Sequence, residues 1–440
     1  MNEVSRGMEQ TEHEGTSRRT LRGRVLEVLE SRTPDGEKVE VLLQAPTEDL
    51  RLLTRAPFSA KRGDWIEVEG SFEGAGRRFL VESLQVIGSP APRPGESFEW
   101  ELPIWTRRRR RLIERSRLLK AIRAFATAEG LVEVETPTLL FAPGQEPHLQ
   151  PFRTIWHGPQ GAREMFLATS PEYAMKRLIA AGMERIFQLG RAYRDGADEL
   201  SPLHSPEFTL LEWYAVGCGL GDIAAQCGRL LETSARDLCG GPVVERDGRF
   251  ADLSGAPRWL SVASAFEEFA AIDLSSYLQN DDEAFLAAVA PRRLREPGDR
   301  RQQADSEFFR TLIERIEPRL GHGAPTVLHS YPARHAALAQ LDGDDPRVAR
   351  RFELYVLGVE LANAFEELRD PAEQERRLLE EQRSRGADGP RYPISQEFLA
   401  ALRSGTPPFS GIALGVDRLH LLISGAEDLS ELLPFPFPAH

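Results

Sequence analysis

The chain has 440 residues, a mass of 49.2 kDa and a formal net charge of −13 at pH 7. Its length predicts two or three domains, and a hydrophobic content of 41% with 28% charged residues is typical of a globular protein with a sizeable core. No run approaches the roughly 20 apolar residues that a membrane helix needs. The first residues lack the apolar core of a signal peptide, so we expect a cytoplasmic protein without a membrane span.

The negative charge argues against broad, non-specific binding of nucleic acids, which relies on many Lys and Arg contacts to phosphate. It does not exclude a local basic patch. The three cysteines, Cys218, Cys227 and Cys239, form no CxxC pair and have no nearby histidine at metal-ligand spacing. We therefore expect reduced thiols and no structural metal.

The first part of the chain predicts a small all-β domain. Residues 1–18 are polar, and we expect them to be disordered. Short alternating apolar runs then fill residues 19–88, separated by turn signals such as Pro34-Asp35-Gly36. Five or so short strands in this span predict an OB-like β-barrel. The same pattern fits any small barrel or sandwich without a binding role.

A proline-rich stretch, residues 89–104, predicts the main domain boundary, because three prolines in eight residues continue neither a strand nor a helix. Residues 105–440 form the second predicted domain. It begins with an arginine run, 107–111, that leads into an amphipathic helix through about Glu129, with Gly130 as its C-cap. The arginine run fits a solvated helix start as well as a contact for an acidic partner or RNA.

The rest of the second domain predicts an α+β fold. Strands are expected at 132–135, 166–168, 352–354, 359–362 and 411–414, and helices at about 171–181, 221–236, 371–385 and 416–424. Because these elements follow no regular βαβ rhythm, we expect an antiparallel sheet flanked by helices.

Four segments carry polar residues that a core would not select. In the first, Ser170 is placed to cap a helix, Pro171 suits its first position, and Glu172 complements its N-terminus. In the second, two apolar runs predict an antiparallel hairpin from Phe187 to Tyr214, with Arg194 at the mouth of its loop. A guanidinium suits phosphate because its planar fork donates two parallel hydrogen bonds. A surface hairpin with ion pairs is the alternative.

The third segment, residues 351–367, places acids among apolar residues. If the chain turns near Leu357, Glu353 and Glu360 lie on neighbouring strands and are able to share a divalent cation, while Glu367 is placed to take a substrate amine. The alternative is that these acids lie on the solvent-facing sides of the strands.

In the fourth segment, 410–419, a strand bounded by glycines runs into a helix with Arg418 in its first turn, placed to meet a phosphate. An ordinary strand-to-helix turn would give a similar pattern.

Taken together, the four segments resemble the catalytic domain of class II aminoacyl-tRNA synthetases, in its lysyl branch. Residues 130–137 resemble motif 1, the hairpin beginning at Phe187 resembles motif 2, and residues 415–418 resemble motif 3. The resemblance covers roughly residues 105–436. Within the branch, the segments SPEYAMKRLIAAG, PEFTLLEWY, ELANAFEEL and SGIALGVDRL look like the elongation factor P lysine ligases, which aminoacylate a protein lysine instead of tRNA.

The resemblance implies a role for each matching residue. Arg194 and Arg418 would be catalytic and hold ATP phosphates, and Glu353 and Glu360 would hold Mg²⁺. The residues implied in ATP binding are Arg194, Asp195, Glu199, His204, Ser205, Glu360, Leu361, Gly415 and Arg418. Those implied in substrate binding are Ser170, Pro171, Glu172, Glu212, Tyr214, Asn363, Glu367 and Ala413. Lysyl-tRNA synthetases typically have Ala at the Ser170 position and Gly at the Ala413 position, so these two residues would shape the pocket toward β-lysine.

The sequence departs from the family pattern at several positions. The motif 2 loop is longer by about two residues, which makes Glu199, or alternatively Asp198, the acid expected at adenine. Ser205 replaces an Asn, and Ala364 replaces a Gly and is expected to crowd the pocket. The N-terminal barrel is the largest departure, because these ligases usually lack an OB domain and lysyl-tRNA synthetases carry one.

The expected function is ATP-dependent activation of lysine or β-lysine and transfer to a lysine side chain of elongation factor P, by a homodimer as is common in class II relatives. The alternatives are a lysyl-tRNA synthetase that binds tRNA through the barrel, and a non-catalytic paralogue that senses lysine or adenylate.

Overall fold

The computed structural model describes residues 18–33, 36–44, 49–55, 58–73, 78–89, 102–147, 149–196, 199–385 and 389–437. The expected disordered segment 1–18 and the proline-rich stretch 89–104 therefore lie largely outside the described residues. The chain divides into two compact units, residues 1–107 and 108–440, which are treated separately below.

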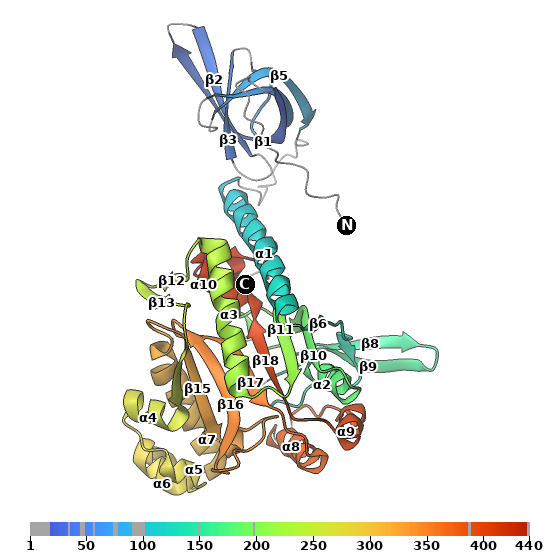
Figure 1. Ribbon diagram of the computed structural model, residues 1–440, viewed down its shortest axis with the longest axis vertical. Coiled ribbons are helices and arrows are strands. Elements are labelled where there is room, and N and C mark those ends of the chain that lie inside the picture. The colour runs from blue at the N-terminus through green and yellow to red at the C-terminus, as the bar shows by residue number, and fades with distance from the viewer. Residues whose placement is uncertain are drawn as a thin grey trace. The chain divides into compact units, whose positions relative to one another are not determined.

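The first unit is a closed five-stranded barrel (Figure 1, blue) with strand order β1-β2-β3-β5-β4. Its strands are β1 (Arg19–Thr33), β2 (Gly36–Gln44), β3 (Asp49–Arg55), β4 (Trp65–Glu73) and β5 (Arg78–Gly88). β1 pairs antiparallel with β4 and so closes the barrel, and β3 pairs in parallel with β5. Alternate residues such as Val39, Val41 and Leu43 point into a fully buried interior. This confirms the predicted OB-like barrel.

The second unit is built on an eight-stranded sheet of order β14-β15-β16-β17-β18-β11-β10-β6. These strands are β6 (Val132–Glu133), β10 (Arg185–Tyr193), β11 (Glu207–Val216), β14 (Arg258–Ser261), β15 (Thr326–Pro332), β16 (Val348–Val356), β17 (Val359–Glu366) and β18 (Phe409–Gly415). Only the two outermost pairs, β14 with β15 and β10 with β6, are parallel. The predicted α+β fold with an antiparallel sheet is confirmed.

Three helices cover one face of this sheet: α1 (Leu102–Ala128), α3 (Leu220–Cys239) and α10 (Val416–Ser424). Figure 1 shows α1 and α3 lying across the strands. Alternation along β11 buries Leu211 and Trp213 in the core under these helices. The intervening Glu212 and Tyr214 therefore point to the opposite face, which is where polar chemistry is possible.

The remaining elements surround the sheet. A small sheet comprises β7 (Leu139–Leu140), β8 (Arg153–Gly158) and β9 (Gly161–Leu167), and a hairpin comprises β12 (Val243–Arg246) and β13 (Arg249–Asp252). The other α-helices are α2 (Glu172–Ala180), α4 (Val262–Ala270), α5 (Ser275–Leu278), α6 (Asp282–Val289), α7 (Arg300–Thr311), α8 (Pro371–Ser384) and α9 (Gln396–Arg403). One π-helical turn, η3 (Leu312–Ile316), follows α7, and 3₁₀ turns lie at η2 (Pro291–Arg295), η4 (Glu317–Arg319), η5 (Ala333–His335) and η6 (Leu429–Glu431).

Several local predictions are confirmed and two need correction. The chain turns at Leu357 and Gly358, both with positive φ, so Glu353 and Glu360 do lie on neighbouring strands. The strand expected at 132–135 is shorter, and Pro171 occupies the N-cap of α2 and not its first helical position. Among the described residues, no helix is long and apolar enough to cross a membrane. All three cysteines are free thiols.

Candidate active site

A cavity of about 1600 Å³ opens on the sheet face opposite α1 and α3. Sixteen of the residues expected at the site line it: Ser170, Glu172, Arg194, Glu199, His204, Ser205, Glu212, Tyr214, Glu353, Glu360, Leu361, Asn363, Glu367, Ala413, Gly415 and Arg418. Two expected residues do not line it. Pro171 is buried at the start of α2, where its carbonyl accepts the Met175 N–H, and Asp195 is exposed beyond the cavity, with its backbone bonded to Gln150.

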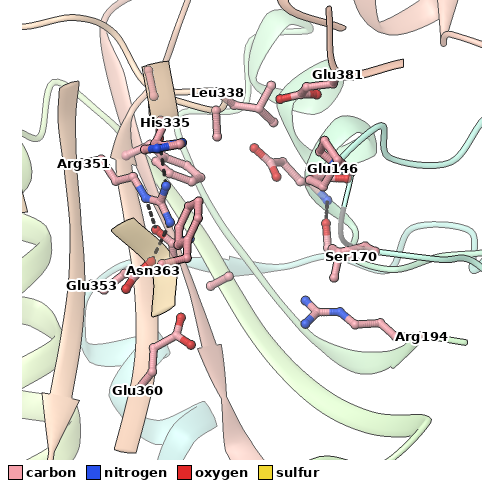
Figure 2. Close-up of a pocket in the computed structure, with 18 of the residues that line it drawn as sticks. Glu146, Ser170, Arg194, His335, Leu338, Arg351, Glu353, Glu360, Asn363 and Glu381 are labelled. Carbon is pink, nitrogen blue, oxygen red and sulfur yellow. Dashed lines mark hydrogen bonds and ion pairs between the residues drawn. The ribbon is translucent and has the colours of Figure 1, made fainter. Parts of the chain in front are cut away.

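Arg194 projects into this cavity from the end of β10. Its backbone N–H donates to the carbonyl of Pro206, which fixes the mouth of the hairpin, and its guanidinium carbon lies 4.9 Å from the ring centroid of Phe208. Burial lowers the pKa of Arg194 from its usual value, and nearby acids led by Glu199 oppose this. Its buried Nε has no hydrogen-bond partner, and Figure 2 shows the guanidinium facing the cavity. It is therefore held by stacking and remains able to donate to an anion.

Arg418 joins three parts of the site. Its Nη1 donates to the carbonyl of Glu360 at 2.8 Å and to Glu360 Oε2 at 3.2 Å, and its Nη2 lies 2.7 Å from His204 Nε2. The Nδ1 of His204 in turn lies 2.8 Å from Ser201 Oγ. The first turn of α10, strand β17 and the motif 2 loop are thus connected through one guanidinium.

Glu353 is bonded on both of its carboxylate oxygens. Its Oε2 accepts the hydroxyls of Tyr331 at 2.5 Å and Tyr355 at 2.7 Å, and its Oε1 lies 2.5 Å from Nη2 of Arg351. Burial raises the pKa of Glu353, and the Arg351 charge opposes that rise. Arg351 also donates to Asn363 Oδ1 and stacks over Tyr331, so it orients two of the expected site residues (Figure 2).

A third carboxylate, Glu317, lies near Glu353 and Glu360, and sequence reasoning missed it. The Tyr355 hydroxyl donates to Glu317 Oε1 at 3.2 Å. Burial first, and then the charges of Glu360 and Glu353, raise the pKa of Glu317 to about 7. Glu360 is more open than Glu353, since 38% of its side chain is exposed against 10% for Glu353. The described residues contain no cluster of three His, Cys, Asp or Glu side chains placed to hold a metal by themselves.

A second group of charges lies at the amino end of α2. Glu172 Oε1 is 2.5 Å from Nζ of Lys176, and the same ammonium contacts Glu367 Oε2. Glu212 Oε2 accepts the Tyr214 hydroxyl at 3.0 Å. Because Glu212 and Glu367 are almost fully buried, burial raises the pKa of Glu212 well above its usual range and that of Glu367 to about 8. Burial therefore favours the neutral forms of Glu212 and Glu367.

The backbone beside this cluster has no room for a larger residue. A Cβ atom at Gly411 would lie 2.7 Å from Glu367 Oε1 and 2.2 Å from Tyr214 Cε1. Ala413 is paired with Glu212 on β11 and with Asn363 on β17. The missing side chain at Gly411 thus makes room for the Tyr214 ring and the Glu367 carboxylate. The close approach of a ligand to β18 stays a prediction.

Two further acids line the cavity beyond Glu172, and no sequence motif pointed to them. Glu146 and Glu381 face the same region in Figure 2. Burial raises the pKa of Glu146, with the charge of Glu172 adding to it, and raises that of Glu381 to about 8, with Glu146 as the next cause.

Three sequence departures can now be located. Ala364 does not crowd the cavity, which is a correction, because its side chain is fully buried in the core on the helical side of the sheet. Ser205 and Glu199 both line the cavity, whereas Asp198 lies outside the described residues. The hydroxyl of Ser170 accepts the backbone N–H of Glu172 at 3.2 Å, but Pro171 is the N-cap residue of α2, so the prediction that Ser170 caps the helix needs correction.

The family model for class II tRNA synthetases of the D, K and N group matches residues 104–438. The chain belongs to the class II aminoacyl-tRNA synthetase family. It is a ligase, and the family implies the use of ATP. The family match, the curated relatives described next and the resemblance to elongation factor P ligases all indicate the same class of reaction.

Those relatives are named elongation factor P–(R)-beta-lysine ligase. The protein from Hamiltonella defensa is 37% identical over 328 residues, and the one from Salmonella gallinarum is 38% identical over 327 residues. The one from Proteus mirabilis is 37% identical over 328 residues. Each match covers 74% of this chain and 94% of the relative. Since 328 residues are 94% of the relative, the relative has about 349 residues, about 91 fewer than this chain.

Proposed function

We propose that the protein activates lysine or β-lysine with ATP and transfers it to a lysine side chain of elongation factor P. The observation that carries this proposal is the group of three carboxylates, Glu172, Glu212 and Glu367, in the same cavity as two arginines suited to phosphate. An amino acid with two amino groups needs several carboxylates, and an adenylate needs fixed cations. The names of the relatives, all elongation factor P–(R)-beta-lysine ligases, support the acceptor and the β-lysine isomer.

In the first step, an oxygen of the amino acid carboxylate attacks the α-phosphorus of ATP in line. The bond from that phosphorus to the bridging oxygen breaks, and pyrophosphate leaves with the bonding pair. Arg194 and Arg418 neutralise the charge that develops on the phosphoryl oxygens. His204, Glu199, Ser205, Leu361 and Gly415 would surround the nucleotide.

In the second step, the neutral amine of the acceptor lysine attacks the carbonyl carbon of the aminoacyl-adenylate. The bond from this carbon to the phosphate oxygen breaks, AMP leaves with the bonding pair, and the new amide nitrogen gives its extra proton to solvent. No side chain needs to form a covalent bond to the substrate. Holding the reactants together supplies much of the rate.

The donor set fits Mg²⁺, which proteins usually bind through one or two carboxylates together with substrate phosphates. Glu360 would hold the ion with its exposed carboxylate, and Glu353 Oε1 retains acceptor capacity beside Arg351. When bound, the ion would neutralise phosphate charge.

The amino acid would lie against the carboxylate group, with Ser170, Asn363 and Ala413 beside it. By resemblance, Ser170 and Ala413 favour β-lysine over lysine. We further propose that the enzyme acts in the cytoplasm, as a homodimer.

One observation favours a second candidate, a lysyl-tRNA synthetase. The OB-like barrel is a fold that binds oligonucleotides in other proteins, so a contact of the barrel with tRNA is a reasonable alternative use. The shorter relatives carry the ligase name over nearly their whole length, and we therefore place the ligase first.

The activation step is tested by exchange of labelled pyrophosphate into ATP, with (R)-β-lysine, lysine or no amino acid. We expect exchange that requires a diamino acid and Mg²⁺ and is faster with β-lysine. Absence of exchange with either isomer would favour a non-catalytic paralogue and contradict the proposed function.

A further inference from the structure

A buried ammonium lies among the carboxylates that the proposed function assigns to substrate. Only 1% of the Lys176 side chain is exposed, and its Nζ lies 2.5 Å from Glu172 Oε1 and contacts Glu367 Oε2. Glu172 and Lys176 are four residues apart on α2, and Glu367 follows β17, far away in the sequence. Lys176 therefore joins two of the three carboxylates directly.

The position of this ammonium is fixed by packing. Its neighbours on α2, Met175 and Ile179, are buried with Ile186 and Tyr214 in one apolar cluster. The helix cannot rotate without exposing these residues to water, so Nζ stays beside the two acids. A flexible surface lysine would make no such fixed contact.

The charges of the cluster do not balance without a ligand. Glu172 and Glu367 contact the Lys176 ammonium, and Glu212 lies within reach of its charge. When all three carboxylates are ionised, the ammonium therefore leaves two negative charges unbalanced. Glu212 Oε1 and Glu367 Oε1 are buried and have no hydrogen-bond partner. Burial raises the pKa of both acids, as expected for carboxyl groups that lack enough positive charge.

We infer that Lys176 is a positioning residue, which holds the Glu172 and Glu367 carboxylates in place for the substrate. It also leaves the cluster with two unbalanced negative charges, which match the two ammonium groups of a diamino acid. The inference rests on the proposed function and specifies how its pocket selects substrate by charge. Without Lys176, the repulsion between Glu172 and Glu367 would raise the pKa of Glu367 further above about 8, so that Glu367 would stay protonated and lose its acceptor strength.

The first test is the variant Lys176→Met, which keeps the length and apolar stem of the side chain and removes the charge. We expect the KM for β-lysine or lysine in pyrophosphate exchange to rise about tenfold or more, as for a lost charged hydrogen bond, with the KM for ATP within about twofold of wild type. Lys120→Met, at an exposed position on α1, is the matched control and should behave as wild type.

The pH dependence separates positioning from simple packing. In the wild type the amino acid KM should fall as pH rises through about 8, because Glu367 then ionises and accepts the substrate ammonium. In Lys176→Met this fall should move to higher pH by about one unit or more, because the nearby positive charge is gone. A purely structural role would lower the amount of folded enzyme and leave the profile unchanged.

The sharpest test compares Glu367→Gln with the double variant Lys176→Met/Glu367→Gln. Glu367→Gln leaves the cluster with one unbalanced negative charge. The double variant again has two unbalanced negative charges, as in the wild type. We therefore expect the double variant to have a lower amino acid KM than Glu367→Gln alone. The double variant also removes the buried unpaired charge, so it tests the inference even if Lys176→Met does not fold.

The outcomes distinguish this inference from the proposed function. Wild-type enzyme without exchange for either isomer contradicts the proposed function itself. Active wild type, together with unchanged KM and pH profile in Lys176→Met, or a double variant weaker than Glu367→Gln, overturns the role of Lys176.

Discussion

Arg115 on α1 forms a buried ion pair with Asp417 on α10, in which Arg115 Nη1 lies 2.6 Å from Asp417 Oδ1. The two side chains are only 10% and 5% exposed. Thr209 of β11 completes the contact, since its backbone N–H donates to Asp417 Oδ2 and its hydroxyl accepts from Arg115 Nη2. Because Asp417 precedes Arg418, this pair fixes the first turn of α10 and, with it, the phosphate-facing arginine.

We expect Asp417→Asn to destabilise the protein, because it leaves the Arg115 charge buried without its partner. Breaking a buried pair typically costs about 3–5 kcal/mol. Denaturant unfolding followed by circular dichroism measures the change. Asp247→Asn is the matched control, since Asp247 is 81% exposed and should change the free energy of unfolding by less than about 0.5 kcal/mol. Equal losses for the two variants would contradict the role assigned to the pair.

Arg194→Lys should slow amino acid activation, because a lysine ammonium neither stacks on Phe208 nor donates two parallel hydrogen bonds. We expect kcat for pyrophosphate exchange to fall about 100-fold, as for the loss of a charge-stabilising donor. The control is Arg191→Lys, on β10 three residues before Arg194, where the arginine is exposed and lies 3.5 Å from Glu207. If kcat for pyrophosphate exchange fell equally in both variants, the assignment of Arg194 to the site would be wrong.

The ligand-free enzyme should lose stability as pH rises through about 8. Burial raises the pKa of Glu381 to about 8, so the folded state keeps a proton that the unfolded chain releases above its ordinary pKa of 4.5. Since the folded state binds more protons in this window, stability falls between about pH 4.5 and 8. Thermal melting across this range should show the decline, and Glu381→Gln should make it shallower, since other buried acids such as Glu317 and Glu367 contribute the rest.

Glu380→Gln is the matched control for that experiment. Glu380 is the adjacent residue on α8, and its more exposed carboxylate pairs with Arg376. We expect this variant to keep the wild-type decline. A Glu381→Gln enzyme with the same pH dependence as wild type would show that Glu381 does not hold the proton.

The choice between the lysine isomers should depend on Ser170 and Ala413. The double variant Ser170→Ala/Ala413→Gly removes a hydroxyl and a methyl group from the cavity, and should shift the ratio of kcat/KM toward lysine by about tenfold, the usual effect of a small change in pocket shape. Ala364→Gly is the control, because its methyl group lies in the core away from the cavity and should affect stability only. An unchanged ratio in the double variant would remove these residues from the account of specificity.

The sequence predicted much of the site because the relevant residues stand in continuous segments with unusual polarity. Glu353, Glu360 and Glu367 interrupt an apolar run, and the turn at Leu357 follows from the adjacent Gly358. The OB-like barrel was predictable from alternation and turn signals.

What the sequence did not predict depends on contacts between distant segments. From the sequence alone, Lys176 resembles an ordinary surface lysine that pairs with Glu172 on the same helix. Its burial becomes evident only in the fold, where Glu367 lies beside α2. The face of Ala364 depends on the register of β17 against β16 and β18. The helical block from α4 to α7 has its own buried core, but its sequence carries no recognised motif.

The most direct test of the central proposal offers the enzyme two acceptors side by side. Labelled (R)-β-lysine or lysine, ATP and Mg²⁺ are incubated with elongation factor P and bulk tRNA, and acid-precipitable label is followed on each. We expect base-stable label on elongation factor P, greater with β-lysine, because an amide to a lysine side chain resists mild base. Base-labile label on tRNA alone would contradict the proposal and make the enzyme a tRNA ligase.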